Sequence, residues 1–220
     1  QQPVMYSLRA NDDVACALDW LAAEAGIEKV ALIGRCSGGY PALLSAVADE
    51  RVVGSFMINV RKLHWDPDED IYKAIREPVE PLDTYRKNLG SSRQLKRVLS
   101  GELPISTIVR RLSHTLAAIA DKKLARLLRN RSKHYRIGRI VNERLQALKK
   151  RNVVVGFVFS QGDPGLIDLY GWAGPNAEKL SAYPNLKLAV IEDADHNLSP
   201  VPIRAEVTRT LLDLLRGLPS

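Results

Sequence analysis

Apolar positions in the first sixty residues follow two different periods. Between residues 13 and 22 they recur on one face of a helix, which residues 11–13 can cap and Gly26 can end. Residues 29–34 and 52–59 are instead short, nearly continuous apolar runs, which are typical of buried strands. A Gly-rich turn and a helix of small residues separate the two runs. This part of the chain therefore predicts alternating helices and strands.

The same pattern returns in the last third of the chain. Residues 152–159 and 186–191 are again short apolar runs, and residues 201–215 have the period of a helix. Apolar strands that alternate with helices indicate a parallel sheet covered by helices on both faces. We therefore expect an α/β fold whose core combines residues 1–63 and 152–220.

The middle of the chain, residues 64–151, contains no convincing strand. Apolar residues at helical spacing trace amphipathic helices there, the last from Ile137 to Leu148, with Arg and Lys on the other faces. We expect this segment to be a basic helical lid inserted into the core.

Charge distinguishes this lid from the rest of the chain. Between Arg86 and Arg151 there are 19 Lys or Arg against three acids, so the segment carries +16 and the remainder −9 of the net +7. A solvated lid is one interpretation. The other is a face that docks an anion, namely acyl carrier protein, the phosphates of acyl-CoA or an anionic membrane surface. Aromatic residues are scarce here, with Tyr135 in the segment and Tyr85 directly before it, so we do not expect nucleic acid binding.

The remaining composition indicates an ordinary globular enzyme or binding protein. No apolar run is long enough to span a membrane, and the first residues do not have a signal-peptide pattern. The two cysteines, Cys16 and Cys36, are expected to be free thiols in a reducing cytoplasm. No His/Cys cluster has metal-ligand spacing, so neither a metal nor another cofactor is expected.

The Gly-rich turn carries the first candidate for chemistry. Gly34-Arg35-Cys36-Ser37-Gly38-Gly39 lies between a predicted strand and a predicted helix, and it has the small-x-nucleophile-x-small spacing of a nucleophile elbow. Side chains at Gly34 and Gly38 are expected to clash with neighbouring backbone. Cys36 is then the nucleophile, and the Ser37 N–H is an oxyanion donor. The alternatives are a buried structural thiol at Cys36, or Ser37 as the nucleophile.

An acid and a base follow in the order that a triad requires. Asp163 lies in the segment that follows the third strand and His196 in the segment that follows the fourth, and the carboxyl ends of parallel strands meet at one end of a sheet. We expect His196 to be the base and Asp163 to orient it. Turn chemistry at Asp163 and a surface role for His196 are the alternatives. His64 and Trp65, after the second strand, are candidates for lining a pocket.

These motifs resemble the α/β-hydrolase superfamily over roughly residues 10–62 and 152–216. The Gly-x-Cys-x-Gly-Gly box formed by Gly34, Cys36, Gly38 and Gly39 is similar to that of dienelactone hydrolases and polyhydroxyalkanoate synthases. The resemblance implies four earlier strands and a second oxyanion donor, for which only about a dozen residues precede the first helix. Three alternatives follow: a preceding segment completes the sheet, a partner chain completes it, or the fold is reduced.

The function predicted from this sequence is acyl transfer through a thioester on Cys36. The enzyme is expected to be an ester or thioester hydrolase or an acyltransferase. The alternative is a non-catalytic binding or scaffold protein that keeps the hydrolase fold.

Overall fold

The computed structural model describes residues 9–66 and 131–218, with isolated positions at 117, 120, 124, 127 and 128. The chain divides into two compact units, Gln1–Pro67 with Arg139–Ser220, and Asp68–Gly138. The first unit contains the sheet. Most of the predicted lid lies outside the described residues, so its helical structure and its boundaries stay predictions.

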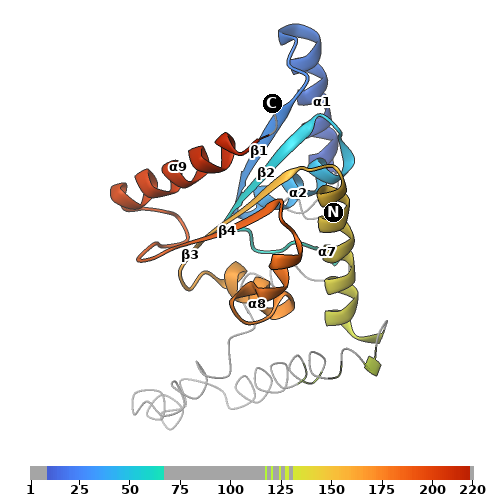
Figure 1. Ribbon diagram of the computed structural model, residues 1–220, viewed down its shortest axis with the longest axis vertical. Coiled ribbons are helices and arrows are strands. Elements are labelled where there is room, and N and C mark those ends of the chain that lie inside the picture. Colours follow the sequence, from blue (N-terminus) through green and yellow to red (C-terminus); the bar gives the residue numbers. More distant parts are fainter. Residues whose placement is uncertain are drawn as a thin grey trace, which may run out of the picture. The chain divides into compact units, whose positions relative to one another are not determined.

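The sheet has four parallel strands in the order β1-β2-β3-β4 (Figure 1). They are β1 (Val30–Arg35), β2 (Val52–Ile58), β3 (Val154–Ser160) and β4 (Leu186–Ile191). Each begins and ends within two residues of an apolar run read from the sequence. The predicted α/β class with a mostly parallel sheet is therefore confirmed.

Helices cover both faces of the sheet. In Figure 1, α9 lies on one side of the strands, and α1, α2 and α7 lie on the other. The helices of the described residues are α1 (Arg9–Ala25), η2 (Cys36–Gly38), α2 (Gly39–Ala48), α7 (Lys133–Lys150), α8 (Pro164–Ala173), η4 (Pro175–Ala182) and α9 (Val201–Arg216). The first of them begins at Arg9, before the cap that the sequence suggested.

Glycines in the strands let α9 approach the sheet closely. A Cβ at Gly54 of β2 would come within 2.7 Å of Leu218, and one at Gly156 of β3 within 2.7 Å of Leu214. The side chains of Ile58, Val158 and Val207 are buried where this helix meets the sheet. The two strand glycines therefore leave room for the side chains of Leu214 and Leu218, and larger side chains of the strands and of α9 fill the rest of this side of the core.

The helix predicted at residues 137–148 belongs to the core unit through its C-terminal part. Val141, Leu145 and Leu148 of α7 are fully buried, at the spacing of one helix face. Burial of side chains of this size stabilises the fold by roughly 1.5–3 kcal/mol each.

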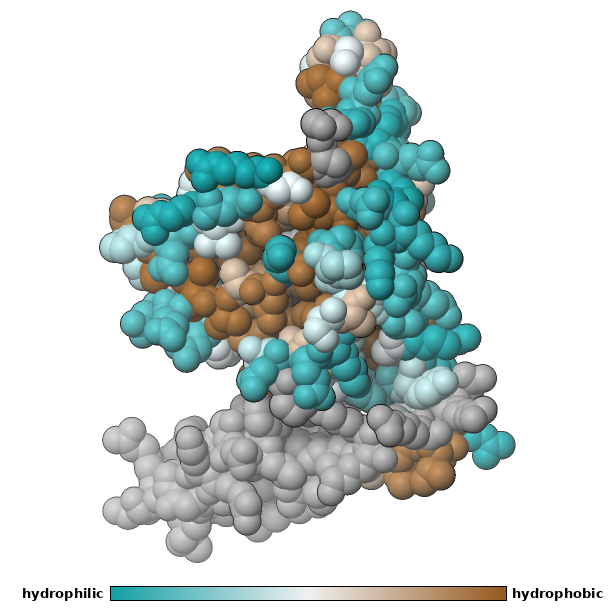
Figure 2. Space-filling model, viewed as in Figure 1, coloured by the Kyte–Doolittle hydropathy of each residue, from teal (hydrophilic) through white to brown (hydrophobic). Residues whose placement is uncertain are grey.

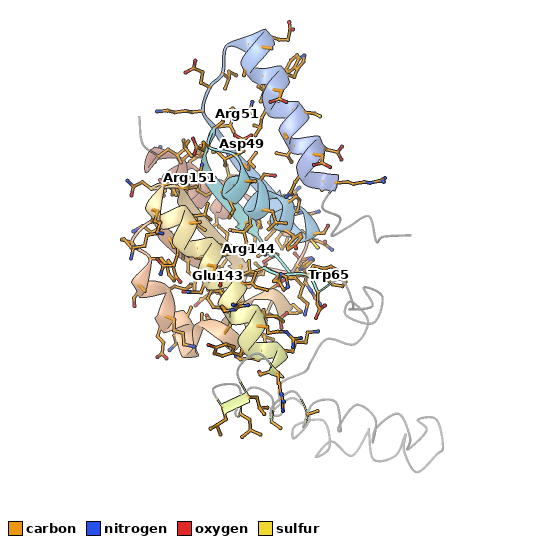
Figure 3. All side chains as sticks on the ribbon, turned by 90° about the vertical axis from the view of Figure 1, so that its right-hand side faces the viewer. Asp49, Arg51, Trp65, Glu143, Arg144 and Arg151 are labelled. Carbon is orange, nitrogen blue, oxygen red and sulfur yellow. The ribbon has the colours of Figure 1, made fainter. Side chains whose placement is uncertain are left out.

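Arg151, directly after α7, binds the C-terminal end of α2. Its guanidinium donates to the carbonyl oxygens of Ala46 at 2.7 Å and Asp49 at 2.8 Å. These carbonyls lie at or just after the end of a helix, where intrahelical donors run out. In Figure 3 Arg151 lies beside Asp49 and Arg51 at this end of α2. One arginine of the basic segment is therefore a structural cap.

Candidate active site

The turn after β1 has the strained backbone expected of a nucleophile elbow. Cys36 has φ +54°, in the left-handed region that non-glycine residues rarely adopt, and its side chain is half-buried. The residue lies between the last residue of β1 and the start of α2. The chain therefore reverses sharply at the predicted nucleophile.

Two of the three predicted glycines have a steric reason. A Cβ at Gly34 would come within 2.1 Å of the Gly38 carbonyl oxygen, and one at Gly39 within 2.8 Å of the Val60 side chain. The steric argument is wrong for Gly38, because a Cβ there meets no atom within 4 Å and its φ is −66°. The tight contact at the elbow is made by the backbone of Gly38 against Gly34.

The predicted acid and base are in direct contact. His196 Nδ1 lies 2.6 Å from Asp163 Oδ2. The carboxylate is buried, whereas the imidazole keeps 35% of its side chain exposed. A buried carboxylate at Nδ1 holds the ring in one orientation and leaves Nε2 toward the open side.

Asp163 also has the role in local backbone structure that was the alternative interpretation of its sequence context. It is the N-cap of α8, with Pro164 next to it, and its Oδ1 accepts a hydrogen bond of 2.7 Å from the Gly165 N–H. One carboxylate oxygen therefore caps the helix while the other binds His196. Turn chemistry and the orienting role are compatible here.

The third member of the predicted triad is not bonded to the other two. Within the described residues, the Cys36 thiol is free and has no hydrogen bond to His196 or Asp163. Ser37, the predicted oxyanion donor, is half-buried in η2 beside the thiol. The structure brings His196 and Asp163 together, and the roles of Cys36 and Ser37 stay predictions.

The candidate pocket residues follow β2. Trp65 is buried and His64 is half-buried, and Figure 3 shows Trp65 on the same side of the molecule as Arg144 of α7. Arg144 donates a hydrogen bond of 2.6 Å to the Leu63 carbonyl and lies 5.8 Å from the Tyr40 ring centroid. These contacts attach the segment after β2 to α7, and a pocket lined by His64 and Trp65 stays a prediction.

Residues that the sequence analysis did not consider hold the segment around His196. Asn59 is fully buried, and its side chain binds Ser160 and the His196 carbonyl. Asp195 accepts hydrogen bonds from the hydroxyl and the N–H of Ser199, and these bonds, above all the one from the hydroxyl, lower the pKa of Asp195. The only signal in the sequence was a polar residue directly after an apolar run.

The described part of the chain has neither a cluster of metal ligands nor a membrane-spanning helix. Among its residues, no group of three or more His, Cys, Asp or Glu side chains is placed to hold a metal ion. None of its helices is both long and apolar enough to cross a membrane.

Comparisons with known proteins found matches among solved structures alone. No protein-family profile and no curated protein matches the sequence. Among solved structures, it is similar to a structure from work on carboxylesterases of the thaumarchaeon Nitrososphaera gargenis, with 17% identity, a TM-score of 0.47, and coverage of 94% of this chain and 74% of that one.

Two further structures have similar values. One is MGS-MChE2, an α/β hydrolase from the metagenome of lagoon sediments at Mar Chica, Morocco, with 16% identity, a TM-score of 0.43, and coverage of 97% of this chain and 74% of that one. The other is a probable hydrolytic enzyme, PA3053 of Pseudomonas aeruginosa, with 18% identity, a TM-score of 0.41, and coverage of 100% and 72%. One of the three structures is thus an α/β hydrolase, and the other two come from work on carboxylesterases and on a probable hydrolytic enzyme.

Proposed function

We propose that this protein is an acyl-transfer enzyme of the hydrolase type, with Cys36 as nucleophile, His196 as base and Asp163 as the orienting acid. The observation that carries the proposal is the 2.6 Å contact between His196 and the buried Asp163 carboxylate. It joins two residues that are 33 positions apart in the sequence, in loops at the carboxyl ends of the strands, where Cys36 with its strained backbone also lies. Strain of this kind gathers at functional sites.

The proposed reaction has two balanced halves. In the first, the Cys36 sulfur bonds to the acyl carbon of an ester or thioester, and His196 Nε2 takes the thiol proton and gives it to the leaving group as its bond to carbon breaks. In the second, water or another acceptor gives its proton to His196 and bonds to the acyl carbon. The carbon–sulfur bond then breaks, and the thiol regains a proton. Hydrolysis and transfer differ only in the acceptor.

The carboxylate selects the tautomer that this chemistry needs. Asp163 Oδ2 accepts only if His196 Nδ1 carries a proton, so the lone pair of a neutral ring lies on Nε2. The helix that begins behind the elbow favours negative charge on a thiolate at Cys36. The two free cysteines support a reducing compartment, and we propose a cytoplasmic reaction.

The open edge of the sheet supports a further part of the proposal. β1 is the last strand on its side of the described sheet, so its outer backbone groups face no strand there. We propose that a preceding segment or a partner chain adds a strand at this edge. The loop after such a strand would be a source for the second oxyanion donor that the resemblance implies.

The basic segment supports a docking face for an anion only in part. Arg144, Lys149 and Arg151 donate to backbone carbonyls, and so serve the fold. Arg139 is exposed on α7 but forms an ion pair of 3.8 Å with Glu143. The support that remains is the excess of 19 Lys or Arg over three acids between Arg86 and Arg151, and we propose that this basic segment is part of a surface for acyl carrier protein, acyl-CoA or an anionic membrane. Binding of coenzyme A, used as the probe, should then weaken steeply with added salt, and a flat response would contradict it.

A second candidate function is a non-catalytic binding protein on the same scaffold. The observation that favours it is that the Cys36 thiol has no hydrogen bond to His196 in the described residues. A binding protein has no need for that contact, whereas a catalytic pair must form it at least when substrate is bound.

Thiol reactivity separates the two candidates, and the chain provides its own control. Cys16 is an exposed thiol on α1, away from the elbow. With p-nitrophenyl acetate, intact mass should show an acetyl adduct in Cys16→Ala and none in Cys36→Ala. Iodoacetamide should alkylate Cys36 about tenfold faster than Cys16 at neutral pH. Equal rates and no adduct would favour the binding protein.

A further inference from the structure

The proposed base, His196, lies on a segment that must span the width of the sheet to approach Cys36. β4 ends at Ile191, and β4 and β1 are the opposite edges of the described sheet. Strands lie about 4.8 Å apart, so three spacings put β4 about 14 Å from the strand that carries the elbow. Residues 192–200, which we call the His loop, must therefore run back over the ends of β3 and β2 for His196 to approach Cys36.

Three successive carbonyls of the His loop are bound by side chains of three successive strands. Ser160 Oγ donates to the Asp195 carbonyl at 2.8 Å, and Asn59 Nδ2 donates to the His196 carbonyl at 2.9 Å. Arg35 Nη1 donates to the Asn197 carbonyl at 3.1 Å. The donors belong to the carboxyl ends of β3, β2 and β1 in that order. The loop is therefore attached at each strand that it crosses.

The middle attachment has a single hydrogen-bonding arrangement. The Ser160 N–H donates to Asn59 Oδ1 at 2.8 Å, which fixes the orientation of the amide. Asn59 Nδ2 then donates to both Ser160 Oγ, at 2.9 Å, and the His196 carbonyl. Asn59 has φ +48°, a conformation that asparagine tolerates better than most residues. A buried network with every bond made holds its members in one geometry.

We propose that Arg35, Asn59 and Ser160 are positioning residues that hold the backbone of the His loop over the nucleophile elbow. The inference rests on the proposed function, since it acts through His196. Asp163 orients the imidazole ring, whereas these three side chains fix the peptide that carries it. Arg35 also precedes Cys36 in the chain, so one side chain ties the strand of the nucleophile to the loop of the base.

The test compares Arg35→Met and Ser160→Ala with Arg35→Lys and with a control. Arg35 is exposed, so its variants should fold even if a change at the buried Ser160 does not. The control is Thr208→Ala, which removes an exposed hydroxyl-to-carbonyl bond on α9. With p-nitrophenyl acetate, Arg35→Met and Ser160→Ala should lower kcat about tenfold and leave KM within about twofold. Arg35→Lys should recover part of the loss, and Thr208→Ala should not differ from wild type.

A second readout needs no turnover. The His196 Nδ1 proton bonded to Asp163 should give a downfield NMR signal, and its exchange with water should be about fivefold faster in Arg35→Met than in wild type or Thr208→Ala. Unchanged exchange and unchanged kcat in the positioning variants would overturn the inference. Lower thermal stability without either change would do the same. Faster exchange in a protein with no esterase activity would reject the proposed function and leave the positioning role standing.

Discussion

At the scale of single residues, Gly34 and Gly38 on either side of Cys36 differ in how much space there is for a side chain. Gly34→Ala should lower the free energy of unfolding by about 1–3 kcal/mol, because its Cβ would lie 2.1 Å from the Gly38 carbonyl oxygen. Gly38→Ala, with open space at the Cβ, should stay within about 0.5 kcal/mol of wild type. Urea unfolding followed by circular dichroism measures both. Equal losses would contradict the steric account of the elbow.

Asp49 gives a pH-dependent prediction. Its hydrogen bonds with the Arg51 side chain hold the pKa of the Asp49 carboxyl below its usual value. A carboxylate with a lowered folded-state pKa stabilises the fold above the unfolded-state pKa, and the effect is lost as pH falls through the folded-state value. Asp49→Asn should therefore lower the free energy of unfolding by about 0.5–1 kcal/mol at pH 7.

The same difference should shrink below about pH 4, where the Asp49 carboxylate of the unfolded chain starts to take up a proton while that of the folded protein stays ionised to lower pH. Urea titrations of wild type and Asp49→Asn across this range test the sign. Asp213→Asn, which breaks an exposed pair with Arg216 on α9, is the control for the loss of one carboxylate. A difference that grows toward acid pH would show that the sign is wrong.

The contact between Asp163 and His196 could be predicted from sequence, but the residues that hold the loop of His196 could not. Asp163 and His196 were found because each lies in the loop that follows an apolar strand, and strand ends converge in a parallel sheet. Arg35, Asn59 and Ser160 follow or end strands in the same way, yet their partners depend on where the His loop crosses the sheet. Those contacts span 35 to 162 residues, and no local pattern encodes them.

At the scale of elements, the hydrogen bonds from Arg151 to the end of α2 should contribute to the free energy of unfolding. Arg151→Met keeps the length of the side chain but leaves the Ala46 and Asp49 carbonyls without this charged donor. The free energy of unfolding should fall by about 1.5–3 kcal/mol, the range for a hydrogen bond with a charged partner. Lys150→Met, an exposed neighbour of the same charge, is the matched control. Equal and small effects would make Arg151 a solvated surface charge.

The elements themselves were largely visible in the sequence, because each strand is a short run of mostly apolar residues. β2 and β3 are buried along most of their length, so their runs stand out, and α7 buries the face that its apolar period marks. The helix α8 was not predicted, since Gly-Asp-Pro-Gly is equally a good turn. In the structure, Asp163 is the N-cap and Pro164 lies in the first turn of this helix. The sequence alone does not show whether these two residues start a helix or form a turn.

At the scale of the whole molecule, apolar side chains reach the surface of the described core. Figure 2 shows them between α9 and the helices on the other side of the sheet. On the strands, the exposed large apolar residues are Ile33 of β1, at 51%, and Val190 of β4, at 38%. Both strands are edges of the described sheet. β4 carries an exposed lysine, Lys187, within the strand, whereas the charged residue of β1, Arg35, is its last residue and donates to the Asn197 carbonyl. An exposed lysine within a strand opposes strand pairing. β1 is therefore the edge more open to another strand.

The final prediction follows from this difference between edges. Ile33→Lys places a charge on the open strand and should suppress concentration-dependent association of this chain, whereas Val190→Lys on the already charged edge should change it little. Light scattering across a dilution series measures both, and urea unfolding shows whether either variant loses stability. If the two substitutions act equally, the association does not use the β1 edge. If a peptide or chain that adds a strand is present, Ile33→Lys should weaken its binding as well, because the charge would be covered by the added strand.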